Sequence, residues 1–597
     1  MIRFLCLLSL LDLAPWAVLS GQPPNILLIL TDDQGYGDLA LHGNTVARTP
    51  HLDRLGQQSM RFDQFHVTPV CATTRASLLT GKNHLDVGVW GVHVSRDYLH
   101  LDEVTVADVL QERGYDTGYI GKWHSGRAPA WMPWHRGFAD GWVADLYQHH
   151  QTEVSHNGSS VQLKGWADES LTQLAMDYID ERERPFFLML SYLSIHTPIE
   201  APASLTRKYR EAGHSPYFSE LNGMLENLDA QIGRLLAHLD QKGLSEETVV
   251  IFTSDNGPIH RDRTQDSKLA GPEIALRCPQ RLKGVKGNIW QNALRVPCFI
   301  RWPGKIRPAT IEALTDVTDL FPTLLDLAGV GQTKAREDLA GLSLVPFLAG
   351  RQEAWPQPRE LFRSHWEVSL QGPMNKHNVL VDKHDLQYDS QIAAWRKGPY
   401  KFVQLRSKSL SLYDVMEDPR EKEDLLAAQP ELAAELARKT EAAFRESVAR
   451  PHSFVHPRFH IGHPEYDRYA RVGGNLRGSQ IPCGGGIRMT GGVRAENLWS
   501  ENWKAAGDSQ TFPVEVVTAG RYQVFLEARG GKAGATFRLE IGSASLENQV
   551  QALGDRRALG TIQLATGMQE MTLSLVEPPP GGQKPFEQLR VIELRKQ

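Results

Sequence analysis

The sequence is short of cysteine and has no large excess of either charge. Only five cysteines occur among its 597 residues. Cys6 lies in the leading segment and Cys71 has a separate interpretation below, so Cys278, Cys298 and Cys483 allow at most one disulfide. The net charge is −5 and no run of like charge stands out, so we expect no nucleic-acid partner. With 41% hydrophobic residues, the stability of the chain must come from a large core.

Long hydrophobic runs are also missing, apart from the first 20 residues. No later segment is apolar over ~18 residues, so we expect no membrane span in the mature protein. At the start, Arg3 precedes two apolar runs (residues 4–11 and 14–19) that are interrupted by Asp12 and Pro15 and followed by Ser20 and Gly21. Residues 1–20 therefore predict a signal peptide and a secreted or periplasmic protein. The alternative is a buried N-terminal helix.

Short apolar runs alternate with helical patterns over the next 300 or so residues. Strands are predicted at residues 25–30, 115–120, 186–193 and 249–253, and residues 217–242 have the spacing of an amphipathic helix. This alternation predicts an α/β domain with a large mixed, mainly parallel sheet flanked by helices.

Ionisable or amide side chains follow each of these four strands. They are Asp32 and Asp33 after the first, Lys122 and His124 after the second, His196 after the third, and Asp255 and Asn256 after the fourth. Open α/β sheets bind ligands outside the carboxyl ends of their strands, so we expect these side chains to converge. The four oxygen donors suit Ca²⁺ or Mg²⁺ better than zinc. The alternative is that the acidic residues only cap helices or turns.

Residues 70–81 are the stretch around which the other motifs are interpreted. A short helix is predicted at residues 75–80, ending at Gly81, with Cys71 and Arg75 at its head. The start of a helix offers unpaired backbone N–H groups and the positive end of the helix dipole, which suits a nucleophile that works beside an anion. A lone cysteine here is otherwise a small buried hydrophobe. Together with a metal and the cationic side chains at the strand ends, this stretch predicts a pocket for a tetrahedral oxyanion ester.

This stretch resembles the signature of type I sulfatases, which belong to the alkaline phosphatase-like superfamily. The signature reads Cys-x-Pro-Ser-Arg followed by Leu-x-Thr-Gly, and Cys71, Arg75, Leu78, Thr80 and Gly81 match it. Thr73 and Thr74 depart from it. Further blocks that resemble the family lie at residues 32–39, 121–124, 254–257, 282–287, 319–329 and 412–425. The resemblance covers about residues 24–450.

The resemblance implies a set of roles, residue by residue. Cys71 would be oxidised by a formylglycine-generating enzyme, and the hydrated aldehyde would be the nucleophile. One Ca²⁺ would be bound by Asp32, Asp33, Asp255, Asn256 and the modified Cys71. Arg75 would stabilise the aldehyde hydrate, Lys122 and Lys286 would hold the sulfate, and His124 and His196 would bracket the nucleophile and the leaving group.

Three departures from the family pattern bear on modification and specificity. Thr73 stands where the family has proline or alanine, which affects recognition by the modifying enzyme. Ser125 replaces a leucine, and residues 291–295 replace Glu-Gly-Gly-Ile-Arg near Lys286. We expect the specificity-determining wall of the pocket around Asn292 and residues 364–367.

The pattern of predicted secondary structure changes after about residue 350. A turn at residues 398–399 leads into a short strand, and residues 431–448 predict a helix. The resemblance places a small antiparallel sheet here. Residues 451–597 lie outside the resemblance, and their period-two strands predict a β-sandwich of about 100 residues. Trp499 and Trp503 in this part are expected to pack internally, the alternative being carbohydrate-stacking platforms.

The predicted organisation is a signal peptide (1–20), a catalytic domain (21–350), its C-terminal subdomain (351–450) and an accessory β-sandwich (451–597). The predicted function is hydrolysis of sulfate monoesters, with a sulfated carbohydrate or a small aryl sulfate as substrate. One alternative is a phosphomonoesterase or phosphodiesterase of the same superfamily, which would use serine or threonine with two zinc ions. The other is a catalytically inactive protein that binds sulfated glycans.

Overall fold

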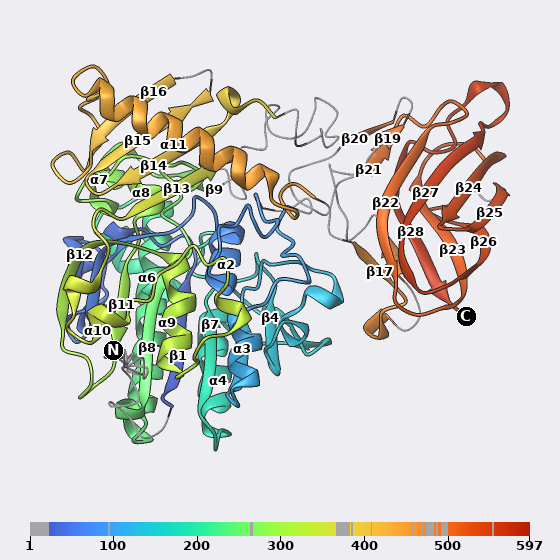
Figure 1. Cartoon of the computed structure of the whole chain (residues 1–597). Helices are drawn as coiled ribbons and strands as arrows, with labels where there is room; N and C mark the ends of the chain where they lie inside the picture. Colours follow the sequence, from blue (N-terminus) through green and yellow to red (C-terminus); the bar gives the residue numbers. More distant parts are fainter. Residues whose placement is uncertain are drawn as a thin grey trace, which may run out of the picture.

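The computed structural model describes residues 23–92, 96–262, 267–365, 383, 386–406, 409–455, 458–466, 470–472, 483–484, 487–490, 499–551 and 554–597. The predicted signal peptide, Trp366 and Glu367 lie outside these residues. A large α/β body carries a smaller antiparallel sheet, and an all-β part follows at the C-terminus (Figure 1). Within the described residues, no helix is both long and apolar enough to cross a membrane.

A ten-stranded sheet forms the middle of the large body. Its order is β12-β2-β11-β8-β1-β7-β3-β4-β5-β6. The four strands predicted from the sequence lie side by side and parallel at its centre: β8 (Thr248–Ser254), β1 (Asn25–Thr31), β7 (Phe186–Ser191) and β3 (Asp116–Gly121). The third ends at Ser191, two residues earlier than predicted. The other members are β2 (Met60–His66), β4 (Asp140–Ala144), β5 (Glu153–His156), β6 (Ser159–Gln162), β11 (Cys298–Arg301) and β12 (Ala309–Asp316). Antiparallel pairs involving β11, β5 and β6 make the sheet mixed, as predicted.

Helices cover both faces of this sheet, because alternate residues of each central strand point to opposite sides. Leu27 and Ile29 of β1 belong to the core under α1 (Pro50–Gln57), α4 (Ala167–Asp180) and α6 (Pro216–Gln241). Ile26 and Leu28 belong to the core under α2 (Cys71–Thr80), α3 (Val106–Glu112) and α9 (Leu320–Leu327). Shorter helices complete the body: α5 (Ala203–Glu211), α7 (Gly271–Arg277), α8 (Gln291–Leu294) and α10 (Val345–Leu348).

The predicted small antiparallel sheet is present. It consists of β13 (Glu360–His365), β14 (Ile392–Lys397), β15 (Tyr400–Leu405) and β16 (Ser409–Asp414). The turn between β14 and β15 needs positive φ at Gly398 (φ 55°), a conformation that glycine adopts without strain. Helix α11 (Pro430–Ala449) covers one face, where Leu436 packs with Phe402 and Leu412.

The C-terminal part has two six-stranded sheets that share one core. Its longer strands are β22 (Ser509–Val516), β23 (Gly520–Arg529), β24 (Ala535–Ile541), β25 (Ala544–Val550), β26 (Arg556–Leu564), β27 (Gly567–Glu577) and β28 (Gln588–Lys596). Shorter strands are β17 (Phe459–Ile461), β18 (Ala470–Val472), β19 (Cys483–Gly484), β20 (Arg488–Thr490) and β21 (Trp499–Glu501). Trp503 is fully buried against Phe537 and Phe586, as expected of a packing residue. The side chain of Trp499 lies outside the described residues.

An aromatic contact joins this sandwich to the large body. Trp131, in the loop between β3 and β4, lies with Tyr98 and Phe459 at ring-centroid distances of 5.3 to 5.8 Å. All three side chains are buried in the same core as the sandwich interior. Burial of a side chain of this size is worth roughly 1.5–3 kcal/mol. The sandwich therefore packs firmly on a loop that also leads to the strand-end residues.

Candidate active site

The four predicted oxygen donors meet at the carboxyl edge of the central strands, and each is fully buried. The amide Nδ2 of Asn256 donates to Asp33 Oδ1 at 2.7 Å, and one oxygen each of Asp32 and Asp255 lies within 4.8 Å of Cys71 Sγ. Three oxygens on these residues, Asp32 Oδ1, Asp33 Oδ2 and Asn256 Oδ1, accept no hydrogen bond from the described residues. Each buried acceptor left in this state costs about 1–3 kcal/mol or more. The donor set therefore fits a hard divalent cation that binds oxygen.

Three cationic side chains enclose the same point. Arg75 is fully buried and donates Nε and Nη2 to Asp255 Oδ2 at 3.0 and 2.7 Å. Lys122 Nζ contacts Asp32 Oδ2, and Lys286 Nζ lies 2.5 Å from Asp33 Oδ1. Burial opposes the charged form of both lysines, but the carboxylates beside them raise their pKa values, so both stay protonated.

The formal charges of the side chains in this cluster sum to zero, before any bound ion or substrate is counted. Three carboxylates (Asp32, Asp33, Asp255) face three cations (Arg75, Lys122, Lys286). Burial alone would raise the pKa of Asp33, but Lys286, His196 and Lys122 hold it well below its usual range. A divalent cation would leave the site with an excess of two positive charges, which favours an anionic ligand.

Cys71 is the first residue of α2, so the helix starts four residues earlier than predicted. Two threonine hydroxyls of its first turn hydrogen-bond the backbone just before the helix. Thr73 Oγ1 donates to the carbonyl of Val70 at 2.8 Å, and Thr74 Oγ1 accepts from the amide of Thr68 at 3.0 Å. Thr73, which departs from the family pattern, therefore fits at the start of the helix with its hydroxyl hydrogen-bonded. The helix ends at Gly81 (φ 68°), as predicted.

His124 lies against Cys71, and Asp97 lies behind it. The distance from Cys71 Sγ to His124 Nδ1 is 3.2 Å, and His124 Nε2 is 3.4 Å from Asp97 Oδ2. Burial lowers the pKa of His124 to about 4, so its ring is neutral, and the carboxylate assigns the ring proton to Nε2. Burial raises the pKa of the Cys71 thiol, which is therefore uncharged at neutral pH. The sequence analysis did not identify Asp97, because nothing in its local pattern marks it as a partner of a residue 27 positions away.

His196 lies beside Asp33, one of the four oxygen donors. Its Nδ1 hydrogen-bonds to the carbonyl of Thr197 at 2.7 Å, and its Nε2 lies 3.9 Å from Asp33 Oδ2. The Tyr147 ring is 5.5 Å from the His196 ring. All the predicted site residues are therefore brought together, and Asp97 and Tyr147 are added to them.

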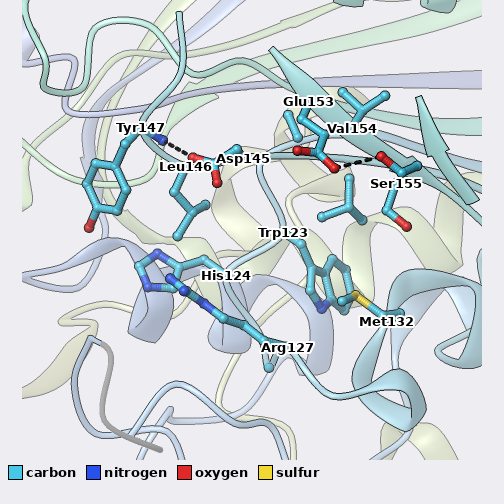
Figure 2. Close-up of a pocket in the computed structure, with 14 residues that line it drawn as sticks. Trp123, His124, Arg127, Met132, Asp145, Leu146, Tyr147, Glu153, Val154 and Ser155 are labelled. Carbon is cyan, nitrogen blue, oxygen red and sulfur yellow. Dashed lines mark hydrogen bonds between the residues drawn. The ribbon is translucent and has the colours of Figure 1, made fainter. Parts of the chain in front are cut away.

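A cavity of about 340 Å³ opens beside His124. Figure 2 shows His124, Arg127, Trp123 and Met132 on one side of it and Asp145, Leu146, Tyr147, Val154 and Glu153 on the other. One wall comes from the loop after β3 and the other from β4, β5 and the connection between them. The cavity therefore combines apolar walls with carboxylate, guanidinium and hydroxyl groups, as expected of a small-molecule site.

The described residues expected to form the specificity wall do not line this cavity. Asn292 is buried and donates Nδ2 to the carbonyl of Gly284 at 2.9 Å, so it fixes the loop before Lys286 and does not line this cavity. Ser364 and His365 do not line it either, and Trp366 and Glu367 lie outside the described residues. The physical reason is that the buried amide is needed to satisfy the backbone of the neighbouring loop.

Comparisons with known proteins give consistent matches. The family model described as Sulfatase matches residues 24–330, and the model described as N-sulphoglucosamine sulphohydrolase, C-terminal, matches residues 285–446. Arylsulfatase A of Homo sapiens is 32% identical over 449 residues, which cover 68% of this chain and 84% of that protein. N-acetylgalactosamine-6-sulfatase of Canis lupus familiaris is 29% identical over 386 residues, which cover 59% of this chain and 70% of that protein.

A similar fold occurs among solved structures. Ps i-CgsB in complex with k-i-k-neocarrahexaose matches with a TM-score of 0.61 and 22% identity, over 72% of this chain and 94% of that chain. At this identity the match supports the fold alone. Both family models end before the C-terminal β-sandwich.

Proposed function

The chain belongs to the sulfatase family and hydrolyses sulfate monoesters, and we propose that it does so with a formylglycine formed from Cys71 and with one calcium ion. The observation that carries the proposal is the set of three buried, unpartnered oxygens on Asp32, Asp33 and Asn256 beside Cys71. Calcium suits these ligands because it takes several oxygen donors in a flexible arrangement. Bound there, the cation would supply positive charge toward the sulfate.

The residues around position 71 are placed to bind a sulfate ester. Lys122 and Lys286 hold the sulfate oxygens, and Arg75 anchors Asp255 and the start of α2. Electrostatic stabilisation of this kind works without reorganisation, because these side chains are buried and already fixed by ion pairs. A hydrated aldehyde at residue 71 would offer one hydroxyl to attack sulfur and a second that lets sulfate leave, so no water need attack the sulfated enzyme.

Two histidines are placed to move protons on either side of the ester. His124 Nδ1 faces residue 71, and its neutral ring accepts a proton there. His196 presents Nε2 to the site, where a proton is needed by the leaving oxygen. The alcohol part of the ester would occupy the cavity of about 340 Å³ beside His124. Its mixture of apolar walls and polar groups suits a sugar ring or a small aryl group.

Replacing Asp97 with asparagine tests the role given to His124. Loss of the carboxylate removes the acceptor that holds the ring proton at Nε2, so we expect kcat/KM for an aryl sulfate to fall roughly 100-fold, the low end of what general acid–base catalysis contributes. In a His124→Ala background, the same substitution should change little, because the effect passes through the ring. Losses that simply multiply would show that Asp97 acts independently of His124.

Comparing ester classes tests the reaction itself. We expect kcat/KM for 4-nitrophenyl sulfate to exceed that for 4-nitrophenyl phosphate by at least about 100-fold. Faster turnover of the phosphate would favour the phosphatase alternative, and binding of sulfated glycans without turnover of any ester would favour the inactive one. A panel of sulfated polysaccharides then separates a carbohydrate substrate from a small aryl sulfate.

The proposal also includes the modification of Cys71 and the export of the protein from the cytoplasm. A formylglycine-generating enzyme would act on Cys71 before folding, because the cysteine is 1% exposed in the folded chain. Residues 1–20 would direct the protein to a secreted or periplasmic location. The cysteine content is consistent with either location: Cys71, Cys278 and Cys298 are free thiols.

A further inference from the structure

A second group of possible metal-binding side chains, which shares no residue with the set at Cys71, lies where the large body meets the segment after α11. His100 and Asp102 belong to the loop before α3, and His452 follows α11. One ligand atom from each of the three lies within 4.8 Å of the others. The two imidazole rings are stacked at a centroid distance of 4.2 Å, and His452 Nε2 is 2.9 Å from Asp102 Oδ2.

His452 is held through both ring nitrogens and His100 through one. His452 Nδ1 is 3.0 Å from Glu103 Oε1, and the other oxygen of Glu103 accepts from Lys82 Nζ at 2.9 Å. His100 Nε2 donates to the carbonyl of Val455 at 3.2 Å. Histidines that bind metals are typically fixed in this way, with the second ring nitrogen donating to a carboxylate or a carbonyl.

With His100 Nε2 engaged by the carbonyl of Val455 and His452 Nδ1 by Glu103, the nitrogens left to bind an ion are His100 Nδ1 and His452 Nε2. A cation bound at this position would displace the proton on His452 Nε2. It would then lie between that nitrogen and the carboxylate of Asp102. Two imidazoles and one carboxylate suit a first-row transition cation such as zinc, in contrast to the oxygen set near Cys71.

A cavity of about 400 Å³ adjoins this group. It is lined by His100, Asp102 and His452 on one side and by Pro513, Glu515 and Met568 of the sandwich on the other. Ligand sites occur preferentially at such boundaries between domains. The cavity leaves room for water in the fourth position of a tetrahedral ion.

We propose that His100, Asp102 and His452 form a zinc-type site that fastens the start of the sandwich segment to the large body. The ion would link the loop at residues 100–103 with the segment at residues 452–455. This link adds to the aromatic contact of Trp131 and Tyr98 with Phe459. It does not depend on the reaction at Cys71.

Calorimetric titration of untagged, chelator-treated protein with zinc chloride tests the site, with calcium present in excess to occupy the oxygen set. We expect one zinc ion per chain, and no such ion in the double variant His100→Ala, His452→Ala. Glu103→Gln keeps all three ligands and should weaken binding about 10- to 100-fold, because it removes only the carboxylate that orients His452.

His156→Ala is the matched control. His156 also pairs with an aspartate (Asp140, 2.8 Å) and stacks on a ring (Trp142), but no second histidine converges with it among the described residues. This variant should bind zinc like the unmodified protein. Zinc should also raise the unfolding temperature of the unmodified protein but not of the double variant. Absence of stoichiometric binding, or full binding by the double variant, would overturn the proposal.

Discussion

We expect Cys71→Ala to abolish sulfate ester hydrolysis and to leave the fold intact. The expected loss is complete within detection, because the substitution removes the nucleophile while Arg75, Lys122 and His124 keep their positions. Replacing this small buried side chain with a methyl group costs only about 1 kcal/mol of unfolding free energy. Turnover of an aryl sulfate and thermal unfolding, measured on the same sample, separate the two effects.

Peptide mass spectrometry of active protein provides the second readout for residue 71. Oxidation of the thiol to the aldehyde removes sulfur and lowers the peptide mass by about 18 Da, and we expect this shift despite Thr73. Cys298→Ala is the control, since Cys298 is also buried and free but lies on β11. It should keep its activity. Fully active protein with only unmodified cysteine at position 71 would refute the mechanism.

We expect removal of calcium, or of the carboxylate of Asp255, to have an effect of similar size. Asp255 is a proposed ligand and also accepts the hydrogen bonds from Arg75 Nε and Nη2. We expect Asp255→Ala to lower kcat/KM by at least about 1,000-fold, because the proposed cation loses a ligand and Arg75 loses its carboxylate partner. Leaving Arg75 buried without its partner also costs roughly 3–5 kcal/mol of stability.

Removing the metal with a chelator leaves Asp255 in place, so Arg75 keeps its partner and that loss of stability does not arise. Protein stripped of metal should lose its activity and recover it with calcium. Recovery of activity with zinc but not with calcium would contradict the assignment of calcium and favour a phosphatase-like centre. Asp229→Asn is a matched carboxylate control: Asp229 is buried too, but it accepts the backbone N–H groups of His51 and Leu52 at the start of α1. This variant should keep its calcium-dependent activity.

The sequence alone was sufficient to predict the central strands and the residues at their ends. The mostly apolar runs that become β1, β7 and β8 are buried on both faces, and such runs are continuous in the sequence. Because parallel strands share one carboxyl edge, Asp32, His196 and Asp255 had to meet there. The same local reasoning identified α6, α11 and the inward-facing residues of β22, β23, β24 and β27.

Tertiary structure decided the contacts that join distant segments without a local pattern. Asp97 meets His124, and His452 meets Asp102, only because loops of unrelated sequence are packed together. Strand β25 has a mostly exposed pattern at the edge of its sheet, so no apolar alternation marks it. The walls of the cavity beside His124 likewise come from segments whose separation is set by the fold. Periodicity and strand order determine which residues share an edge, whereas side-chain packing between loops determines which of them touch.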